Sequence, residues 1–252
     1  MTNFTDTDLI LLTGASSGIG RETAIKLTEL GARVIAVARN KDKLGELKSG
    51  LKNPDIFFVE PFDLSKDIDK IGEFIIEVVQ KYGKISGFVH SAGALRVSTI
   101  KSEEIEEQRN LFNLNYFSAM EIIKTLTNKR YKAENLSVIL MSSIAGLRGE
   151  AGLSTYSSTK GAIISGVRSL AKELGRFNIR VNAVSPGTVR TNIEQSNPDF
   201  FNDSYYEQIK QKWVLPNESK PEYVADLILF LLSQSSCWIT GQNIVIDGGE
   251  SL

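Results

Sequence analysis

The 252-residue chain alternates short, almost uninterrupted apolar runs with longer segments that carry an apolar face at helical spacing. Strands that are covered on both faces read as continuous apolar runs, whereas half-exposed strands alternate apolar and polar residues. Strands that alternate with helices pair in parallel through right-handed crossovers. We therefore expect an α/β fold, with a doubly wound parallel sheet of about seven strands and helices on both faces. The expected strands are Leu9–Leu12, Arg33–Ala38, Ile56–Val59, Ile85–His90, Ser137–Met141, Arg180–Val184 and Asn243–Ile246.

Before the last strand, a long stretch from Ser185 to about Ser236 has no strand signal. Such a stretch in a compact fold is commonly functional, as a lid or a binding loop. We expect residues at about 190–215 to form a substrate loop inserted in a single domain that spans residues 1–252. The loop is rich in aromatic residues that we expect to be exposed and to line the substrate pocket, namely Phe200, Phe201, Tyr205, Tyr206 and Trp213.

Composition excludes several classes of protein. Lys and Arg total 29 against 30 Asp and Glu, so the chain lacks the strong positive charge that non-specific nucleic-acid binding requires. The longest strongly apolar run, Leu227–Leu232, is far shorter than the ~20 residues of a membrane helix. The single cysteine, Cys237, excludes an internal disulfide, and one Cys with one His excludes the usual zinc sites. We expect a cytoplasmic protein with no metal, membrane or nucleic-acid partner.

The first expected strand runs into the segment TGASSGIG at 13–20, and a helical segment follows at once. Glycines let the backbone approach a pyrophosphate, and a helix N-terminus offers free N–H groups and partial positive charge. The spacing G-x-x-x-G-x-G differs from the general dinucleotide fingerprint, so an ordinary Gly-rich turn is the alternative. The position after the first strand favours a dinucleotide site. The residues assigned to it here are Gly14, Ser16, Ser17, Gly18, Ile19 and Gly20.

Cofactor choice in such folds is made at the end of the second strand, where an acid binds the ribose 2′-OH and a basic residue suits a 2′-phosphate. Here the strand ends in Val37-Ala38-Arg39-Asn40, without an acid. The planar, permanently charged guanidinium of Arg39 favours NADP(H) over NAD(H). The alternative is a solvated surface arginine.

Tyr156 and Lys160 are four residues apart in a long helical segment, so their side chains share one face. A nearby ammonium stabilises tyrosinate and lowers the pKa of the tyrosine, which suits a general acid for carbonyl reduction. Tyr206 and Lys210 have the same spacing. We choose the first pair because Ser142 and Ser143 end the fifth strand, at the edge where α/β sheets bind ligands. We expect Tyr206 and Lys210 to belong to the surface or a lid.

Together these residues resemble the short-chain dehydrogenase/reductase family, over essentially the whole chain and in the single-domain branch of about 250 residues. The resemblance implies a Rossmann-like NAD(P)-binding fold and an oxidoreductase that interconverts a carbonyl and a secondary alcohol. It assigns Asn115, Ser143, Tyr156 and Lys160 to catalysis. It assigns a second set of residues to dinucleotide binding. These are the TGASSGIG turn, Arg39, Ala92, Gly93, Tyr156 and Lys160, with Asp63 and Leu64 beside adenine and Pro186, Gly187, Val189 and Thr191 over the nicotinamide.

The resemblance also implies roles. Tyr156 is the acid/base, Lys160 lowers its pKa and binds the nicotinamide ribose, Ser143 polarises the carbonyl, and Asn115 holds a water in a proton relay. Two segments depart from the family pattern: Ser91 replaces the usual asparagine, and Val214–Ser219 lacks the Pro-Leu-Gly-Arg run of many 3-oxoacyl-thioester reductases. His90, the only histidine, is expected to be a packed or hydrogen-bonded strand residue.

The substrate remains open among three hypotheses. The first is a 3-oxoacyl thioester, by similarity to 3-oxoacyl-(acyl-carrier-protein) reductases. The second is a sugar, polyol or other small carbonyl compound, and the third is a non-catalytic dinucleotide-binding regulator, which the intact tetrad disfavours.

An acidic acyl carrier protein, if it is a partner, needs basic residues beside the site, and solvated helix faces are the alternative explanation for the candidates. These candidates are Lys124, Lys129, Arg130, Lys132, Arg168, Lys172 and Arg176. The family resemblance further implies a homo-oligomer, expected to be a tetramer.

Overall fold

The computed structural model describes residues 4–191, 193, 197–216 and 218–252. The strands are β1 (Leu9–Thr13), β2 (Arg33–Ala38), β3 (Phe57–Pro61), β4 (Ile85–His90), β5 (Lys132–Met141), β6 (Ile179–Pro186) and β7 (Asn243–Ile246). The α-helices are α1 (Gly18–Glu29), α2 (Lys41–Ser49), α3 (Ile71–Tyr82), α4 (Ile105–Phe112), α5 (Ser118–Leu126), α6 (Ala145–Arg148), α7 (Ser154–Leu174), α8 (Asp203–Lys210) and α9 (Pro221–Leu232).

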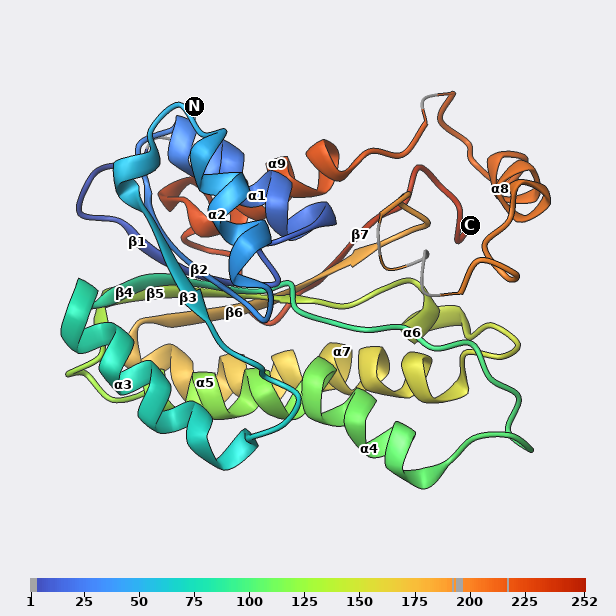
Figure 1. Ribbon diagram of the computed structural model, residues 1–252, viewed down its shortest axis with the longest axis horizontal. Helices are drawn as coiled ribbons and strands as arrows, with labels where there is room; N and C mark the ends of the chain where they lie inside the picture. The colour runs from blue at the N-terminus through green and yellow to red at the C-terminus, as the bar shows by residue number, and fades with distance from the viewer. Residues whose placement is uncertain (1–3, 192, 194–196, 217) are drawn as a thin grey trace.

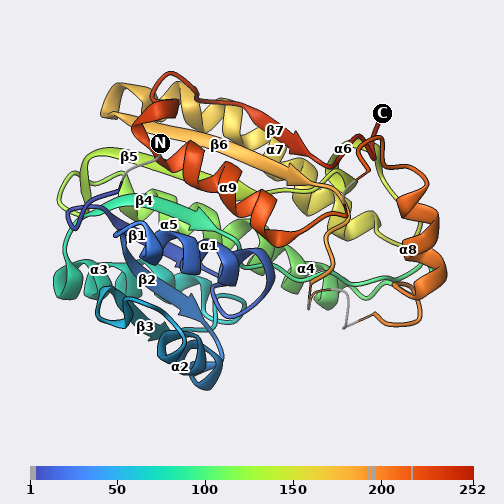
Figure 2. The same cartoon turned by 90° about the horizontal axis from the view of Figure 1, so that it is seen from above.

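The seven strands form one parallel sheet in the order β3-β2-β1-β4-β5-β6-β7. Helices α1, α2 and α9 cover one face, and α3, α4, α5 and α7 cover the other (Figure 1). Figure 2 shows the strands in their spatial order, with β3 and β7 at the two edges. The expected α/β fold and all seven expected strands are thus confirmed, and the main differences are that β5 starts earlier and β6 ends later than expected.

The apolar runs build two separate cores because successive side chains of a strand point to opposite faces. In β1, Leu9 and Leu11 belong to the core under α3, α5 and α7, whereas Ile10 and Leu12 belong to the core under α1, α2 and α9. All four side chains are almost fully buried. Each such side chain contributes roughly 1.5–3 kcal/mol of transfer free energy, so both faces must stay apolar.

The order of the strands reverses between β1 and β4, since the chain moves outward from β1 to β3 and then returns to the other side of β1. Doubly wound sheets bind ligands at the carboxyl ends of the strands beside such a switch point. In Figure 1, α6 and α8 both lie at this end of the sheet. None of the described helices is long and apolar enough to cross a membrane.

The segment after β6 contains α8 and then leads into α9. Its aromatic residues are less exposed than we expected. Tyr206 is only 8% exposed, and the Arg190 guanidinium lies 3.9 Å from the centre of its ring. Lys210 instead pairs with Glu207 at 2.9 Å on the exposed side of α8. Of the two positions expected for this pair, surface or lid, the structure excludes the surface for Tyr206, because α8 turns that side chain inward.

Candidate active site

The turn after β1 requires glycine at its first position. Gly14 has a φ of +73°, and a Cβ there would lie 2.6 Å from the backbone nitrogen of Ala92. The backbone of the turn therefore packs directly on the segment that follows β4. A Cβ at Gly20 would overlap the carbonyl oxygen of Gly14, so this second glycine lets α1 start close beneath the turn. Together the two glycines place the N-terminus of α1 at the switch point.

Helix α1 starts with amide groups that can bind an anion. Its N-cap, Ser17, has an extended backbone and makes no capping side-chain hydrogen bond with the described residues. The first N–H groups of an α-helix have no partner within the helix and carry partial positive charge. The N-terminus of α1 thus fits the pyrophosphate of a dinucleotide.

A cleft of about 490 Å³ runs along the carboxyl ends of the strands. Most of the residues predicted for the site line it: Gly14, Ser16, Ser17, Gly18, Ile19, Arg39, Leu64, Ala92, Gly93, Ser143, Tyr156, Lys160, Pro186, Gly187, Val189 and Thr191. Phe201 and Tyr205 of the inserted segment also line it. Gly20, Asp63 and Asn115 are predicted site residues that do not appear among the lining residues.

At one end of the cleft, Arg39 and Lys43 contribute two cationic side chains to the lining. Asn40 lies between them and caps α2 by accepting a hydrogen bond from the backbone of Lys43 at 3.0 Å. This cap fixes the first turn of α2, which contains Lys43, directly after Arg39 and Asn40. Sequence reasoning missed Lys43, although its spacing of four residues from Arg39 at the start of a helix is a readable signal.

The carboxylate of Asp63 makes hydrogen bonds within its own turn. The carboxylate accepts hydrogen bonds from the backbone and the hydroxyl of Ser65, at 3.0 and 2.6 Å. Burial favours the neutral acid, but these hydrogen bonds and the charge of Arg39 outweigh it and lower the pKa of Asp63. In the structure, Asp63 therefore shapes the turn, and its neighbours Phe62 and Leu64 line the cleft.

The other end of the cleft holds the tyrosine and lysine of α7. Tyr156 and Lys160 are 8% and 4% exposed, and the Nζ atom of Lys160 lies 5.6 Å from the centre of the Tyr156 ring. Burial lowers the pKa of Lys160 to about 8. Nζ donates a hydrogen bond to the carbonyl oxygen of Met141, the last residue of β5, at 2.8 Å. The ammonium group is thus held at the end of the strand, beneath the tyrosine.

Ser143 follows β5 and reaches the same part of the cleft. Its Oγ accepts a hydrogen bond from the backbone nitrogen of Ala145 at 3.1 Å. Since this bond uses a lone pair and not the hydroxyl proton, Ser143 can still donate a hydrogen bond to a carbonyl oxygen. The side chain of Ser142 binds α7 instead, because its Oγ donates a hydrogen bond to the carbonyl oxygen of Lys160 at 2.8 Å.

Asn115 lies in a single π-helical turn, Asn113–Phe117, between α4 and α5. Its side chain is fully buried and links the segment after β4 to α7. The amide oxygen accepts from the Ala94 nitrogen at 2.9 Å, and the amide nitrogen donates to the Ala94 oxygen and to Thr159 Oγ1, both at 3.0 Å. A Cβ at Gly93 would lie 3.3 Å from the amide oxygen of Asn115 and 3.6 Å from Nζ of Lys160, so Asn115 and Lys160 flank the same glycine.

His90 is buried at the end of β4, and its two ring nitrogens have partners. Nδ1 lies 3.0 Å from the Thr13 hydroxyl, and Nε2 lies 3.1 Å from the carbonyl oxygen of Leu114. Burial, aided by the charge of Lys160, lowers the pKa of His90 to about 3, so the ring is neutral at physiological pH. The prediction that His90 is a hydrogen-bonded strand residue is confirmed.

The basic residues proposed for a carrier-protein surface lie at the wrong edge of the sheet. Lys132 begins β5, whereas Ser143 follows the end of that strand. Lys129, Arg130 and Arg176 line a hollow around Lys132 at the amino ends of β5 and β6. The other three lie in the last turn of α5 or the second half of α7, which return to the same edge: Lys124, Arg168 and Lys172. Of the two explanations for these candidates, the structure therefore disfavours a patch around the mouth of the active site.

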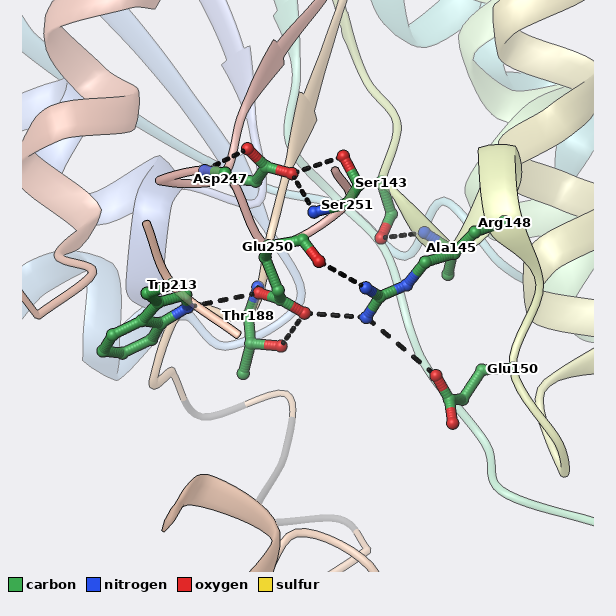
Figure 3. Close-up of polar contacts among 10 residues, drawn as sticks. Ser143, Ala145, Arg148, Glu150, Thr188, Trp213, Asp247, Glu250 and Ser251 are labelled. Carbon is green, nitrogen blue, oxygen red and sulfur yellow. Dashed lines mark hydrogen bonds and ion pairs between the residues drawn. The ribbon is translucent and has the colours of Figure 1, made fainter. Parts of the chain in front are cut away.

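The lining also contains charged and apolar residues that the sequence analysis did not assign. Besides Lys43 they include Leu95, Arg148, Glu150, Leu153, Ile193 and Glu250. Figure 3 shows the guanidinium of Arg148 between the carboxylates of Glu150 and Glu250. Its nitrogen Nη2 lies 2.8 Å from Glu250 and 4.0 Å from Glu150. No sequence signal links Arg148 and Glu250, because about a hundred residues separate them.

Known proteins of the same kind match along almost the entire chain. A family model described as enoyl-(acyl carrier protein) reductase matches residues 14–251. The 3-oxoacyl-(acyl-carrier-protein) reductase FabG of Thermotoga maritima is 36% identical over 243 residues, which are 95% of this chain and 96% of that protein.

Solved structures agree with the fold and the family. A short-chain dehydrogenase/reductase from Brucella melitensis, described as a glucose/ribitol dehydrogenase, superposes with a TM-score of 0.91 at 25% identity, covering 100% of both chains. A 4-hydroxyisoleucine dehydrogenase complexed with NADH superposes with a TM-score of 0.87 at 26% identity, covering 97% of this chain and 99% of that one. The chain therefore belongs to the short-chain dehydrogenase/reductase family and is an oxidoreductase of the kind that binds a nicotinamide dinucleotide.

Proposed function

We propose that this protein is an NADP(H)-dependent reductase that converts a carbonyl group to a secondary alcohol. The observation that carries the proposal is the arrangement of Tyr156, Lys160 and Ser143 around one end of a cleft that is also lined by the start of α1. The dinucleotide supplies the hydride, which adds to the carbonyl carbon. The described side chains then bind the substrate and deliver a proton to its oxygen.

In this proposal Tyr156 is the general acid. As the carbonyl carbon gains the hydride, its oxygen gains negative charge and takes the phenolic proton of Tyr156, leaving a tyrosinate. The buried ammonium of Lys160, 5.6 Å from the ring centre, stabilises this tyrosinate. Lys160 also binds the nicotinamide ribose, and Ser143 donates a hydrogen bond to the same substrate oxygen.

Return of a proton to Tyr156 completes the cycle in the proposal, through a water that Asn115 holds beside Lys160. The shared packing of Asn115 and Lys160 around Gly93 supports this assignment. The Asn115 amide itself is bound to Ala94 and Thr159, so its side chain would act by shaping the water site. Pro186, Gly187, Val189 and Thr191 line the cleft where the proposal places the nicotinamide.

The choice of NADP(H) rests on charge at the opposite end. Arg39 and Lys43 both line the cleft, and the cleft lining contains no acidic residue from the end of β2 or the start of α2. A guanidinium and an ammonium that line the same cleft suit the dianionic 2′-phosphate, whereas a free ribose hydroxyl carries no charge to balance them.

For the substrate we propose a 3-oxoacyl thioester. The lining of the cleft includes apolar and aromatic side chains, which suit an acyl chain better than a polyol: Leu95, Leu153, Ile193, Phe201 and Tyr205. A proton donor aimed at oxygen also fits carbonyl reduction, whereas reduction of an enoyl group ends with protonation at carbon. The inserted segment at about 190–215 is the substrate segment in this proposal.

Loss of NADPH absorbance with acetoacetyl-CoA tests the proposal, with wild-type protein and Tyr156→Phe measured side by side. Turnover that falls by at least 100-fold in the variant, while the variant still binds NADPH, supports both the substrate class and the acid. If NADPH binds but is not consumed, the thioester assignment fails, and a panel of sugars, polyols and small ketones identifies the alternative. Equal activity of both proteins would overturn the role of Tyr156.

The proposal has three further parts. The name of the Thermotoga maritima relative supports an acyl carrier protein as the carrier of the substrate. The lone Cys237 fits the reducing cytoplasm. Ile105 and Phe117 expose large apolar side chains on the α4–α5 segment, which supports a homo-oligomer, expected to be a tetramer. Light scattering of the purified protein measures the mass of the assembly.

A further inference from the structure

The chain ends in a tight turn, Asp247–Ser251, that follows β7. The Asp247 carboxylate accepts hydrogen bonds from the backbone nitrogens of Gly249 and Ser251, both at 2.9 Å, and from the Ser251 hydroxyl at 2.5 Å. Burial opposes ionisation, but these bonds and the charge of Arg148 lower the pKa of Asp247. The turn is therefore ordered by its own first residue, and it directs the side chain of Glu250 inward (Figure 3).

Glu250 has no exposed side-chain surface and collects donors from three other parts of the chain. Oε1 accepts from Arg148 Nη2 at 2.8 Å and from the Thr188 hydroxyl at 3.0 Å. Oε2 accepts from the Thr188 backbone nitrogen at 2.7 Å and lies 3.5 Å from the indole nitrogen of Trp213. The Glu250 carbonyl oxygen binds Arg148 as well, at 2.9 Å. A buried carboxylate with this many donors is held in one position.

Thr188 and Trp213 stand at the two ends of the inserted segment. Thr188 precedes it, directly after β6, and Trp213 closes it after α8. Backbone hydrogen bonds also link the end of the insert to the C-terminal turn. The nitrogens of Val214 and Leu215 donate to the Gly248 carbonyl oxygen at 2.9 and 3.1 Å. Both ends of the insert are thus attached to one turn, which is the C-terminal turn.

The C-terminal turn packs closely against both ends of the inserted segment. A Cβ at Gly249 would lie 2.6 Å from Cγ2 of Val214, and a Cβ at Gly187 would lie 2.7 Å from both Asp247 Cβ and Glu250 Oε2. The close packing requires glycine on both sides of the junction. The position of the loop after β6 therefore depends on where Glu250 lies.

We propose that Glu250 is a positioning residue that clamps both ends of the substrate segment and holds the Thr188 loop in place over the bound dinucleotide. This inference builds on the proposed function, since it assigns the control of substrate and dinucleotide affinity to a residue outside the catalytic group. Glu250 acts through Thr188 and Trp213 and needs no contact with the reacting atoms.

Limited trypsin digestion of the protein without cofactor tests the clamp independently of any activity. The segment offers cleavage sites at Lys210 and Lys212, which are exposed. Glu250→Gln keeps the shape of the side chain but loses the charge that binds Arg148, so we expect cleavage at these sites to be at least fivefold faster than in the wild type. Circular dichroism confirms that the variant is folded.

Glu60→Gln is the matched control. Glu60 is a largely buried carboxylate that also binds a cation and an aromatic donor, Lys81 at 2.7 Å and Tyr82 at 2.5 Å. It lies in β3, away from the inserted segment. The control removes the charge of a carboxylate that binds a cation and an aromatic donor elsewhere in the fold, and we expect its cleavage at Lys210 and Lys212 to stay at the wild-type rate.

Steady-state kinetics then test the coupling to binding. We expect Glu250→Gln to raise KM for the dinucleotide and the carbonyl substrate about tenfold while kcat changes less than threefold, the pattern of lost binding with intact chemistry. The pair Arg148→Met with Glu250→Met replaces the ion pair by apolar side chains that can repack. If Glu250 only stabilises the fold, the double variant has the KM of the wild type. If Glu250 positions Thr188, the double variant regains thermal stability but its KM stays raised.

The outcomes separate the two proposals. Unchanged cleavage in Glu250→Gln would overturn the clamp, and faster cleavage with unchanged KM would overturn its link to binding. Wild-type protein that reduces no carbonyl compound would overturn the proposed function, while the digestion experiment would still report on the clamp.

Discussion

The Nζ atom of Lys160 lies 5.6 Å from the centre of the Tyr156 ring and is anchored at 2.8 Å to the carbonyl oxygen of Met141. The lysine is thus held by the end of β5, and none of the described carboxylates pairs with it. Burial disfavours the ammonium, and the pKa of Lys160 falls to about 8. The protein therefore loses stability by keeping this lysine inside, as expected where a side chain serves chemistry.

Lys160→Met should consequently raise the free energy of unfolding at pH 7 while abolishing activity. The folded pKa of about 8 lies below the ordinary lysine value of 10.5, so below pH 8 the wild type bears the full cost of a buried charge. Between pH 8 and 10.5 the unfolded chain binds more protons than the folded one, and the cost disappears. We expect an advantage of about 1–3 kcal/mol at pH 7 that shrinks by pH 10, measured by urea unfolding of both proteins. An advantage that grows with pH would contradict the assignment.

Ser143→Ala should lower kcat about 100-fold and change the dinucleotide affinity little, because the hydroxyl polarises the substrate and does not hold the cofactor. The Ala145 amide also loses its acceptor, at a cost of about 1 kcal/mol in stability. Ser143→Thr keeps the hydroxyl and should recover most of the rate. Stopped-flow single turnovers of the three proteins give the comparison, and a threonine variant as slow as the alanine variant would argue against a hydrogen-bonding role.

Arg39→Asp should shift selectivity from NADPH toward NADH, and the added change Lys43→Ala should shift it further. Each lost contact with the 2′-phosphate removes about 1.5–3 kcal/mol of binding, which corresponds to more than tenfold in kcat/KM for NADPH. The ratio of kcat/KM for the two dinucleotides is the measurement.

Lys41→Asp provides the control for charge alone. Lys41 begins α2 beside these residues, is exposed, and is not among the residues that line the cleft. We expect its ratio to stay within about threefold of the wild type, which is the size of a screened surface effect. A shift as large as that of Arg39→Asp would show that selectivity follows net charge and not a 2′-phosphate contact.

Tyr206→Phe should leave the chemical step intact, although the side chain is buried. The ring that packs under Arg190 is retained in phenylalanine, and Tyr206 is not among the residues that line the cleft. We expect kcat within about twofold of the wild type and a small change in melting temperature. A loss of turnover comparable to that of Tyr156→Phe would mean that the proton comes from the second Tyr–Lys pair.

The strands and the cofactor turn could be predicted because their signals are local. Leu9–Leu12 is apolar at every position since both faces of β1 are covered, and Gly14 and Gly20 are needed by backbone contacts within a few residues of the turn or across one strand. Lys43 lies in the first turn of the helix that follows the strand, outside the strand end where cofactor choice is usually made.

Other features depend on which residues lie close together in the folded chain, and spacing in the sequence does not predict this. Lys132 and Ser143 are eleven positions apart, yet a strand ten residues long separates them, so a basic run close to a catalytic residue in sequence lies at the opposite edge of the sheet. The contacts of Glu250 join segments that meet only in the folded chain. The sequence did not separate the positions of Tyr206 and Lys210, because the register of α8, which buries the tyrosine, is set by its packing in the folded chain.

The π-helical turn at Asn113–Phe117 has a consequence for the length of this helix. A π turn holds about one residue more than an α turn, and each residue of an α-helix advances the direction of its side chain by about 100°. Removing a single residue from this turn would leave a regular helix and rotate Asn115 away from Ala94 and Thr159. The helix can accept many substitutions along its surface, but its residue count at this point cannot change without misdirecting the asparagine.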